Sequence, residues 1–135
     1  MSEDEQVGIV LVSHSAAVAD AVVELARGLA AGGATAPVAA AGGTSAGGLG
    51  TSAELIAEAA RSVDRGAGVA LLADLGSAVL TVKSMLAEGE LPDGARLVDA
   101  PFVEGAVAAL VTASAGGDLT SVEAAATDAY GYRKV

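Results

Sequence analysis

The chain has 135 residues, enough for one domain over residues 1–135 with a core at about 7–129. Because only 2% of the residues are aromatic, the interior of this domain must be filled by Ala, Val and Leu. One histidine and the absence of cysteine and tryptophan exclude a disulfide framework, a thiolate nucleophile and a cysteine-ligated zinc site. A formal net charge of -10, an acidic start (MSEDEQ) and no run of about 18 apolar residues argue against nucleic-acid binding, a signal peptide and a membrane span, and predict a soluble cytoplasmic protein.

The first third of the chain predicts a strand, a helix and a weaker strand. Residues 7–12 (VGIVLV) form a continuous apolar run, as in a strand buried on both sides of a parallel sheet. From Ser15 onward an amphipathic helix is expected to end at Gly32 and Gly33, and its apolar residues at helical spacing are Val18, Val22, Leu25 and Leu29. Residues 36–41 are a weaker strand candidate, because alanine has poor strand propensity.

A glycine-rich loop, a second helix and a third strand follow. Residues 42–50 contain five glycines, which is typical of a loop. Thr51 and Glu54 have the spacing of a capping box, in which both side chains satisfy backbone N–H groups at a helix start. The helix is expected over residues 55–63 and to end by Gly66 and Gly68, and residues 69–73 (VALLA) predict a buried strand.

The last part of the chain predicts one more strand and three helices. A helix is expected over residues 78–87, a strand around 96–99, and an apolar helix that follows a turn at Pro101 and Gly105 and ends near 115–117. A second capping-box spacing, Thr120 to Glu123, predicts a last helix to about residue 129. The tail at 131–135 is expected to fray.

This alternation of strands and helices predicts an α/β fold. We expect a three-layer sandwich with a mainly parallel sheet of four to five strands, in the order 2-1-3-4, and helices on both faces. Ligands in such sheets bind beyond the carboxyl ends of the strands. Four segments should therefore meet at one edge of the molecule: residues 13–15, 42–50, 74–77 and 101–105.

The only histidine and one aspartate are the candidate catalytic residues. His14 directly follows the first strand, and Asp74 follows the third, where a carboxylate has no evident packing role beyond capping a helix. If these strands are neighbours, the Asp74 carboxylate can accept the Nδ1 proton of His14 and leave Nε2 free as a nucleophile. No other residue set in the chain offers a comparable nucleophile.

Three further residues are candidates for contacting an anion at this site. Gly76 and Ser77 begin a helix, whose exposed N–H groups and dipole favour a phosphoryl group. Thr51 and the glycine loop could line the opposite side of the site. For the loop itself, flexibility alone is an alternative explanation.

Three other chemistries fit the residues less well. No G-x-S-x-G frame surrounds Ser13 or Ser15, and one histidine with scattered carboxylates is too little for a metal site. Residues 48–53 (GLGTSA) match the dinucleotide fingerprint before a helix, but several loop residues separate the match from the preceding strand. Dinucleotide binding remains open as an alternative.

Three segments together carry a family resemblance: residues 7–29 (VGIVLVSHSAAVADAVVELARGL), 71–81 (LLADLGSAVLT) and 98–116 (VDAPFVEGAVAALVTASAG). The chain resembles the phosphotransferase subunits of phosphoenolpyruvate-dependent dihydroxyacetone kinases, whose domain is similar to the IIA domain of mannose-type sugar phosphotransferase systems (PTS). The resemblance extends from residue 7 to about 129. It implies a cytoplasmic phosphotransferase subunit that carries a phosphoryl group on a histidine.

The resemblance also implies roles for partners and residues. His14 would accept the phosphoryl group from HPr, the phosphocarrier protein of the PTS, and pass it to ADP on the nucleotide-binding kinase subunit, which phosphorylates dihydroxyacetone. Asp74 would orient His14, and Gly76 and Ser77 would face the phosphate. The chain itself would bind no cofactor and no metal.

The assembly and the pathway are the remaining expectations. The resemblance implies a homodimer. From the sequence, the apolar face of the helix at 103–115 or the third helix with Val79 and Val82 is the expected contact. The motifs at 49–52 (LGTS), 73–77 (ADLGS) and 100–105 (APFVEG) favour the dihydroxyacetone branch. A IIA component of a mannose-type sugar PTS and a phosphohistidine regulatory module without onward transfer remain alternatives.

Overall fold

The structure, a computed structural model, describes residues 5–30 and 34–135 and is built on a parallel sheet. The strands are β1 (Gly8–Ser13), β2 (Val38–Gly42), β3 (Val69–Ala73) and β4 (Ala95–Leu97). Their order is β2-β1-β3-β4, and each neighbouring pair is parallel. The predicted α/β class and strand order are confirmed. The part of the chain that the structure describes contributes four strands to this sheet.

The central strand β1 is buried along its whole length, as its unbroken apolar sequence predicts. Val12 is paired with Ala41 on β2 and with Ala73 on β3. The next residues along these three strands therefore emerge side by side at the carboxyl edge of the sheet. This register brings the turn after β1 next to the turn after β3.

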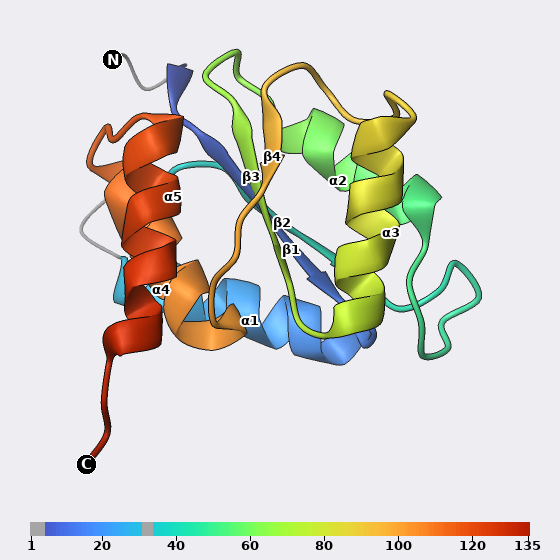
Figure 1. The fold of residues 1–135 in the computed structure, drawn as a ribbon, viewed down its shortest axis with the longest axis horizontal. Helices are drawn as coiled ribbons and strands as arrows, with labels where there is room; N and C mark the ends of the chain where they lie inside the picture. Colours follow the sequence, from blue (N-terminus) through green and yellow to red (C-terminus); the bar gives the residue numbers. More distant parts are fainter. Residues whose placement is uncertain (1–4, 31–33) are drawn as a thin grey trace.

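Helices cover both faces of the sheet, which gives the predicted three layers (Figure 1). One face carries α1 (Ala16–Leu29), α4 (Phe102–Ser114) and α5 (Leu119–Asp128), and the other carries α2 (Ala53–Val63) and α3 (Gly76–Ala87). Alternate residues of β1 serve the two layers, since Ile9 packs toward the first group and Val10 toward the second. Every helix follows a strand directly or through another helix, as in right-handed crossover folds.

Small residues let α4 approach the sheet closely. Gly105 lies inside α4 and not in the turn before it, so the sequence interpretation was wrong at this position. A β-carbon at Gly105 would come 2.8 Å from the Ala100 β-carbon and 3.3 Å from Leu72 Cδ2. The glycine is therefore required by packing and not by a turn conformation.

The apolar stripe of α1 differs from the predicted one. Its buried residues are Ala19, Val22, Val23 and Ala26, whereas Val18, Leu25 and Leu29 are exposed. Small alanines make the close contact with the sheet, and the larger side chains form a second, outward-facing stripe. This outward stripe is apolar surface that the described chain leaves uncovered.

Two helix starts also differ from the capping-box predictions. The α2 cap is Ser52, whose hydroxyl accepts a hydrogen bond from the Leu55 N–H at 3.2 Å, and not Thr51. The α5 cap is Asp118, which accepts from the Ser121 N–H at 2.8 Å, and not Thr120. In both cases a residue one or two positions away has the extended backbone that a cap requires.

The remaining helix ends lie near their expected positions. Helix α3 begins at Gly76, two residues before the predicted start at 78, and α1 ends at Leu29 with Ala30 as its C-cap. The predicted stop at Gly32 and Gly33 lies outside the described residues. Helix α5 continues into the short 3-10 helix η2 (Ala129–Gly131), after which the chain has no regular structure.

The C-terminal segment is tied to the rest of the fold by side chains. Thr127 donates to the Asp99 carbonyl at 2.8 Å, the Tyr130 hydroxyl donates to the Asp99 carboxylate at 2.7 Å, and Lys134 forms an ion pair with Glu104. Among residues 5–30 and 34–135, no helix has the length and apolar character needed to cross a bilayer.

Candidate functional site

His14 occupies the turn between β1 and α1, at the carboxyl edge of the sheet. Its carbonyl accepts a hydrogen bond from the Gly50 N–H at 2.9 Å, and its side chain is about one quarter exposed (23%). The next residue, Ser15, caps α1 by accepting from the Val18 N–H. The imidazole therefore projects from a fixed backbone and is still accessible to solvent.

Asp74 emerges from the end of β3 and contacts His14. The Asp74 Oδ1 atom lies 2.9 Å from His14 Nδ1, and Oδ2 accepts a hydrogen bond from the His14 backbone N–H at 3.1 Å. Oδ1 also accepts from the Leu75 N–H at 2.8 Å. The structure thus brings together the two candidate catalytic residues that the sequence placed on separate strands.

The hydrogen bonds around Asp74 favour its charged form. Burial alone would raise the pKa of this carboxyl, but the His14 N–H, the Ser13 hydroxyl and the imidazole of His14 oppose this effect and leave the pKa lowered from its ordinary value. An ionised carboxylate can only accept hydrogen bonds, so Nδ1 of a neutral His14 carries the ring proton. Nε2 then carries no proton, and its lone pair can accept a hydrogen bond or attack an electrophile.

Ser77 lies at the reactive nitrogen. Its hydroxyl contacts His14 Nε2, and because Nδ1 holds the proton, the hydroxyl is the donor and Nε2 the acceptor. Ser77 is the second residue of α3 and is exposed. It is therefore positioned to contact a group bound to Nε2.

Gly76 provides backbone donors beside Ser77. It is the first residue of α3, whose N-cap Leu75 makes no side-chain capping bond, and the space around its α-carbon is open. N–H groups in the first turn of a helix have no partner within that helix. An anion bound to Nε2 would approach the positive end of α3.

Thr51 reaches the site through other residues. Its hydroxyl is 3.1 Å from that of Thr81, and Thr81 in turn donates to the Ser77 carbonyl at 3.1 Å. These bonds join the segment before α2 to the first turn of α3. Thr51 therefore contacts Ser77 only through Thr81, whereas the sequence predicted that Thr51 lines the site directly.

The glycine-rich loop is attached to the histidine turn at both of its ends. Gly43 N–H donates to the Ser13 carbonyl at 3.1 Å, and Gly50 N–H donates to the His14 carbonyl at 2.9 Å. Gly43 and Gly50 both have positive φ, with values of 72° and 138°, which favours glycine at these positions. The loop therefore braces the turn that carries His14.

Ser13 was not recognised as a site residue from the sequence. It is fully buried and donates its hydroxyl to Asp74 Oδ2 at 2.8 Å. A hydroxyl that ends an otherwise apolar buried strand was the available signal. Its partner depends on the adjacency of β1 and β3, which one sequence does not reveal directly.

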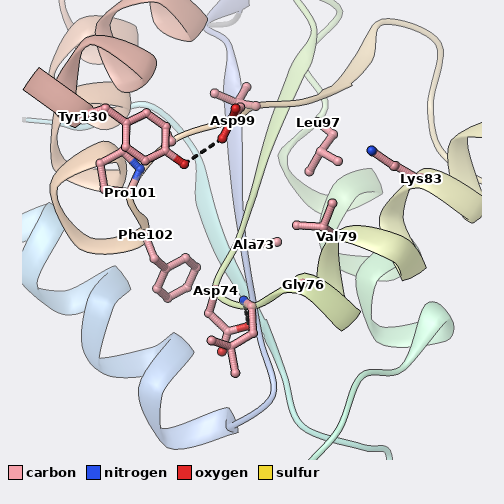
Figure 2. A pocket seen from close by; sticks show the side chains of 13 residues that line it. Ala73, Asp74, Gly76, Val79, Lys83, Leu97, Asp99, Pro101, Phe102 and Tyr130 are labelled. Carbon is pink, nitrogen blue, oxygen red and sulfur yellow. Dashed lines mark hydrogen bonds between the residues drawn. The ribbon is translucent and has the colours of Figure 1, made fainter.

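A cavity of about 490 Å³ adjoins the site; Asp74 and Gly76 are among the residues that line it, and His14 is not. It lies between α3 and the segment that joins β4 to α4, and Figure 2 shows Asp74 at one end and the bond between Tyr130 and Asp99 at the other. That bond raises the pKa of Tyr130 above its ordinary value. Within the described ranges, no three side chains that could ligate a metal ion lie together.

A comparison with protein families places this fold, with its histidine at the carboxyl edge of the sheet, in a class of phosphotransferase-system domains. Residues 8–123 match the family model EIIA-man, described as the fructose IIA component of the PTS. The chain belongs to this family of IIA domains.

Within the family, the chain is similar to dihydroxyacetone kinase subunits. It is 35% identical over 107 residues to phosphoryl donor subunit DhaM of PEP-dependent dihydroxyacetone kinase 2 from Listeria innocua, and the match covers 78% of this chain and 84% of that protein. It is 36% identical over 119 residues to DhaM of Escherichia coli, but there the match covers 86% of this chain and 25% of the relative. The chain is thus a DhaM-like IIA domain.

Two solved structures have a similar fold. A protein of unknown function, EF1359, has 36% sequence identity and a TM-score of 0.79, over 96% of this chain and 98% of that one. A sigma-54 interaction domain protein from Enterococcus faecalis has a TM-score of 0.64 at 17% identity, which bears on the fold alone.

Proposed function

We propose that the chain is the phosphotransferase subunit of a PEP-dependent dihydroxyacetone kinase, in which His14 accepts a phosphoryl group from HPr and passes it to ADP on the nucleotide-binding subunit. The observation that carries the proposal is the pair of contacts made by the His14 ring. Asp74 holds Nδ1 at 2.9 Å, and Ser77 lies at Nε2. The name of the Listeria relative, a phosphoryl donor subunit, supports the same reaction.

The first transfer moves the phosphoryl group between two imidazoles. The Nε2 lone pair of His14 attacks phosphorus, the N–P bond of the phosphohistidine on HPr breaks, and its electron pair stays on the donor ring. Nδ1 of His14 keeps its proton throughout. Asp74 balances the positive charge that develops on the His14 ring.

The second transfer regenerates His14. A terminal phosphate oxygen of ADP attacks phosphorus, an O–P bond forms, and the Nε2–P bond returns its electron pair to the imidazole. Phosphoryl transfer depends mainly on alignment and charge stabilisation. Ser77 turns its hydroxyl from Nε2 to a phosphoryl oxygen, Gly76 offers backbone N–H groups, and Thr51 supports this turn through Thr81.

The surface around His14 fits protein partners. Three exposed leucines are near neighbours in sequence of residues that contact His14. Leu49 precedes Gly50, Leu75 follows Asp74, and Leu80 is about one helical turn after Ser77. Exposed apolar residues grouped around a site are typical of docking surfaces. With a net charge of -10, the chain favours partners whose docking faces are basic.

The proposal includes the assembly and the ligands. Two copies form a homodimer in the cytoplasm, and the chain itself carries neither cofactor nor metal, since ADP is held by the nucleotide-binding subunit. The outward apolar stripe of α1 and the exposed residues of α4 supply a surface for the second copy. Val82 cannot contribute to the alternative contact through α3, because it is fully buried.

The direct test is phosphorylation with purified components. Incubation with phosphoenolpyruvate, enzyme I and HPr should add the mass of one phosphate in an acid-labile, base-stable bond. Because His14 is the only histidine, His14→Ala should abolish the label. Retention of the label in that variant would refute the assignment of His14.

The second stage of the same test separates the pathways. Adding the nucleotide-binding subunit with ADP should remove the label rapidly and produce ATP. A phosphoprotein that remains stable would instead indicate a regulatory module. Transfer to a mannose-type IIB protein in place of ADP would indicate a sugar transport system.

A further inference from the structure

Ser13 is a fully buried polar side chain at the end of β1, next to the histidine site. Its hydroxyl accepts a hydrogen bond from the Ser15 N–H at 3.1 Å and lies 2.8 Å from Asp74 Oδ2. Since the backbone N–H occupies one lone pair and the carboxylate can only accept, the hydroxyl proton points to Asp74. The orientation of this serine is therefore fixed from both sides.

We propose that Ser13 is a positioning residue that acts through Asp74 to keep the ring proton of His14 on Nδ1. The serine holds one carboxylate oxygen, Oδ2, so that the other, Oδ1, stays directed at Nδ1. No contact between Ser13 and the reactive Nε2 is involved. A role in the transfer reaction rests on the proposed function, whereas the control of the ring proton does not.

The sheet explains why this residue can do so. Val12 and Ala73 are paired in register, so the next residues, Ser13 and Asp74, leave adjacent parallel strands at the same level. The Asp74 N–H also donates to the Val12 carbonyl at 3.0 Å, which ties the start of the aspartate turn to β1. Backbone hydrogen bonds between the two strands thus position Ser13 and Asp74, in addition to the hydrogen bond between their side chains.

The carboxylate has two donors on each oxygen. Oδ1 receives Nδ1–H of His14 and the Leu75 N–H, and Oδ2 receives the His14 N–H and the Ser13 hydroxyl. Removing the Ser13 hydroxyl leaves Oδ2 with one protein donor, the His14 N–H, beside a fully buried strand end. The carboxylate then gains freedom to rotate, and its hold on the Nδ1 proton weakens.

The test uses the fact that the chain has one histidine, so nitrogen NMR of the ring reports His14 alone. In the unphosphorylated wild type, we expect the neutral ring to carry its proton on Nδ1. Ser13→Ala should shift the ring nitrogen signals toward a mixture with the Nε2-protonated form. Ser15→Ala is the matched control, because its hydroxyl caps α1 without touching Asp74, and it should leave the signals unchanged.

A double-variant comparison shows whether the effect passes through the carboxylate. In an Asp74→Ala background, Ser13→Ala should cause no further change in the ring signals. Circular dichroism verifies that each variant is folded. Wild-type signals in Ser13→Ala, an equal change in Ser15→Ala, or an undiminished effect without Asp74 would each overturn the proposal.

Reactivity supplies an independent readout that requires no partner protein. Phosphoramidate phosphorylates histidines chemically, and we expect labelling of Ser13→Ala to be slower than that of the wild type by about 10-fold to 100-fold. Labelling of Ser13→Ala at the wild-type rate would also contradict the positioning role. Failure of HPr to phosphorylate a normally reactive His14 would instead count against the proposed function.

Discussion

At the scale of single residues, the site depends on how one carboxylate is held. Asp74 meets His14 through both a side-chain and a backbone contact, so the ring and its own main chain are fixed by the same group. The sequence indicated this pair from the positions of both residues after apolar strands. It did not indicate Ser13, because a buried serine is recognisable only when its partner strand is known.

Asp74→Ala should lower the rate of phosphoryl transfer through His14 by about 10-fold to 100-fold while the protein remains folded, because the ring loses its orienting acceptor. Transfer from phosphorylated HPr, followed in a rapid-quench experiment, measures this change. Asp20→Ala removes an exposed carboxylate from α1 and is a suitable control. Equal rates for the wild type and Asp74→Ala would leave Asp74 with a purely structural role.

The lowered pKa of Asp74 makes its contribution to stability depend on pH. Because the folded-state pKa of Asp74 is below the ordinary 3.8, the ionised carboxylate stabilises the fold at pH values above 3.8. This stabilisation is lost as the pH falls through the folded-state pKa. The difference in unfolding free energy between wild type and Asp74→Ala should shrink as the pH falls below about 5. Urea denaturation at a series of pH values tests this, and a difference that grows toward low pH would contradict it.

At the scale of helices and strands, the sequence predicted the elements well and their ends less well. The order of strands and helices follows from apolar runs and helical spacing, which are properties of long segments. A helix cap depends on the backbone conformation of one residue, which the spacing of side chains does not reveal. The N-cap of α2 is therefore Ser52 and not the predicted Thr51, and that of α5 is Asp118 and not the predicted Thr120. The wrong stripe on α1 has a similar cause, because alanines that pack closely carry little hydrophobic signal.

Gly42 joins the end of β2 to the histidine turn by close packing. A β-carbon there would lie 2.5 Å from the Ser15 carbonyl oxygen and 2.7 Å from the Ala16 α-carbon, both backbone atoms. Gly42→Ala should therefore destabilise the fold by about 2 kcal/mol and slow labelling of His14, since the start of α1 must shift. Thermal unfolding and phosphoramidate labelling measure the two effects.

Gly28→Ala provides the matched control for this substitution. Gly28 lies in α1, and a β-carbon there would meet no atom within 4 Å apart from its own helix backbone and its chain neighbours. The alanine should be neutral or stabilise the helix by about 0.5 kcal/mol. A loss of stability at Gly28 as large as that at Gly42 would mean that close packing is not the cause.

At the scale of the whole molecule, exposed apolar side chains fall mainly into two groups. Leu49, Leu75 and Leu80 lie on the segments that contact His14. A second group lies on α1, α4 and the C-terminal segment and consists of Val18, Leu25, Leu29, Val103, Val111 and Tyr132. All of the second group except Val18 line one apolar groove, together with Glu104, Val107 and Ala108. Separate surfaces would let a dimer form without covering His14.

Val111→Asp should convert the proposed homodimer to a monomer, because it places a charge in the groove between α1 and α4. Sedimentation velocity at matched protein concentrations measures the change. Leu80→Asp is the control, since Leu80 is exposed on α3, on the other face of the sheet. If Leu80→Asp dissociated the dimer and Val111→Asp did not, the contact would lie at α3 and the proposed groove between α1 and α4 would be wrong.

Two hydrogen bonds to the histidine turn divide the glycine-rich loop into anchors and a tip. Gly43 and Gly50 fix the carbonyls of Ser13 and His14, whereas residues 45–49 between them are exposed. Substitutions of the exposed side chains at the tip therefore leave these two bonds in place, whereas a change at either anchor alters the turn. The loop thus separates an exposed tip, where a change of sequence acts on the surface beside the site, from the two glycines that hold the backbone of the histidine turn.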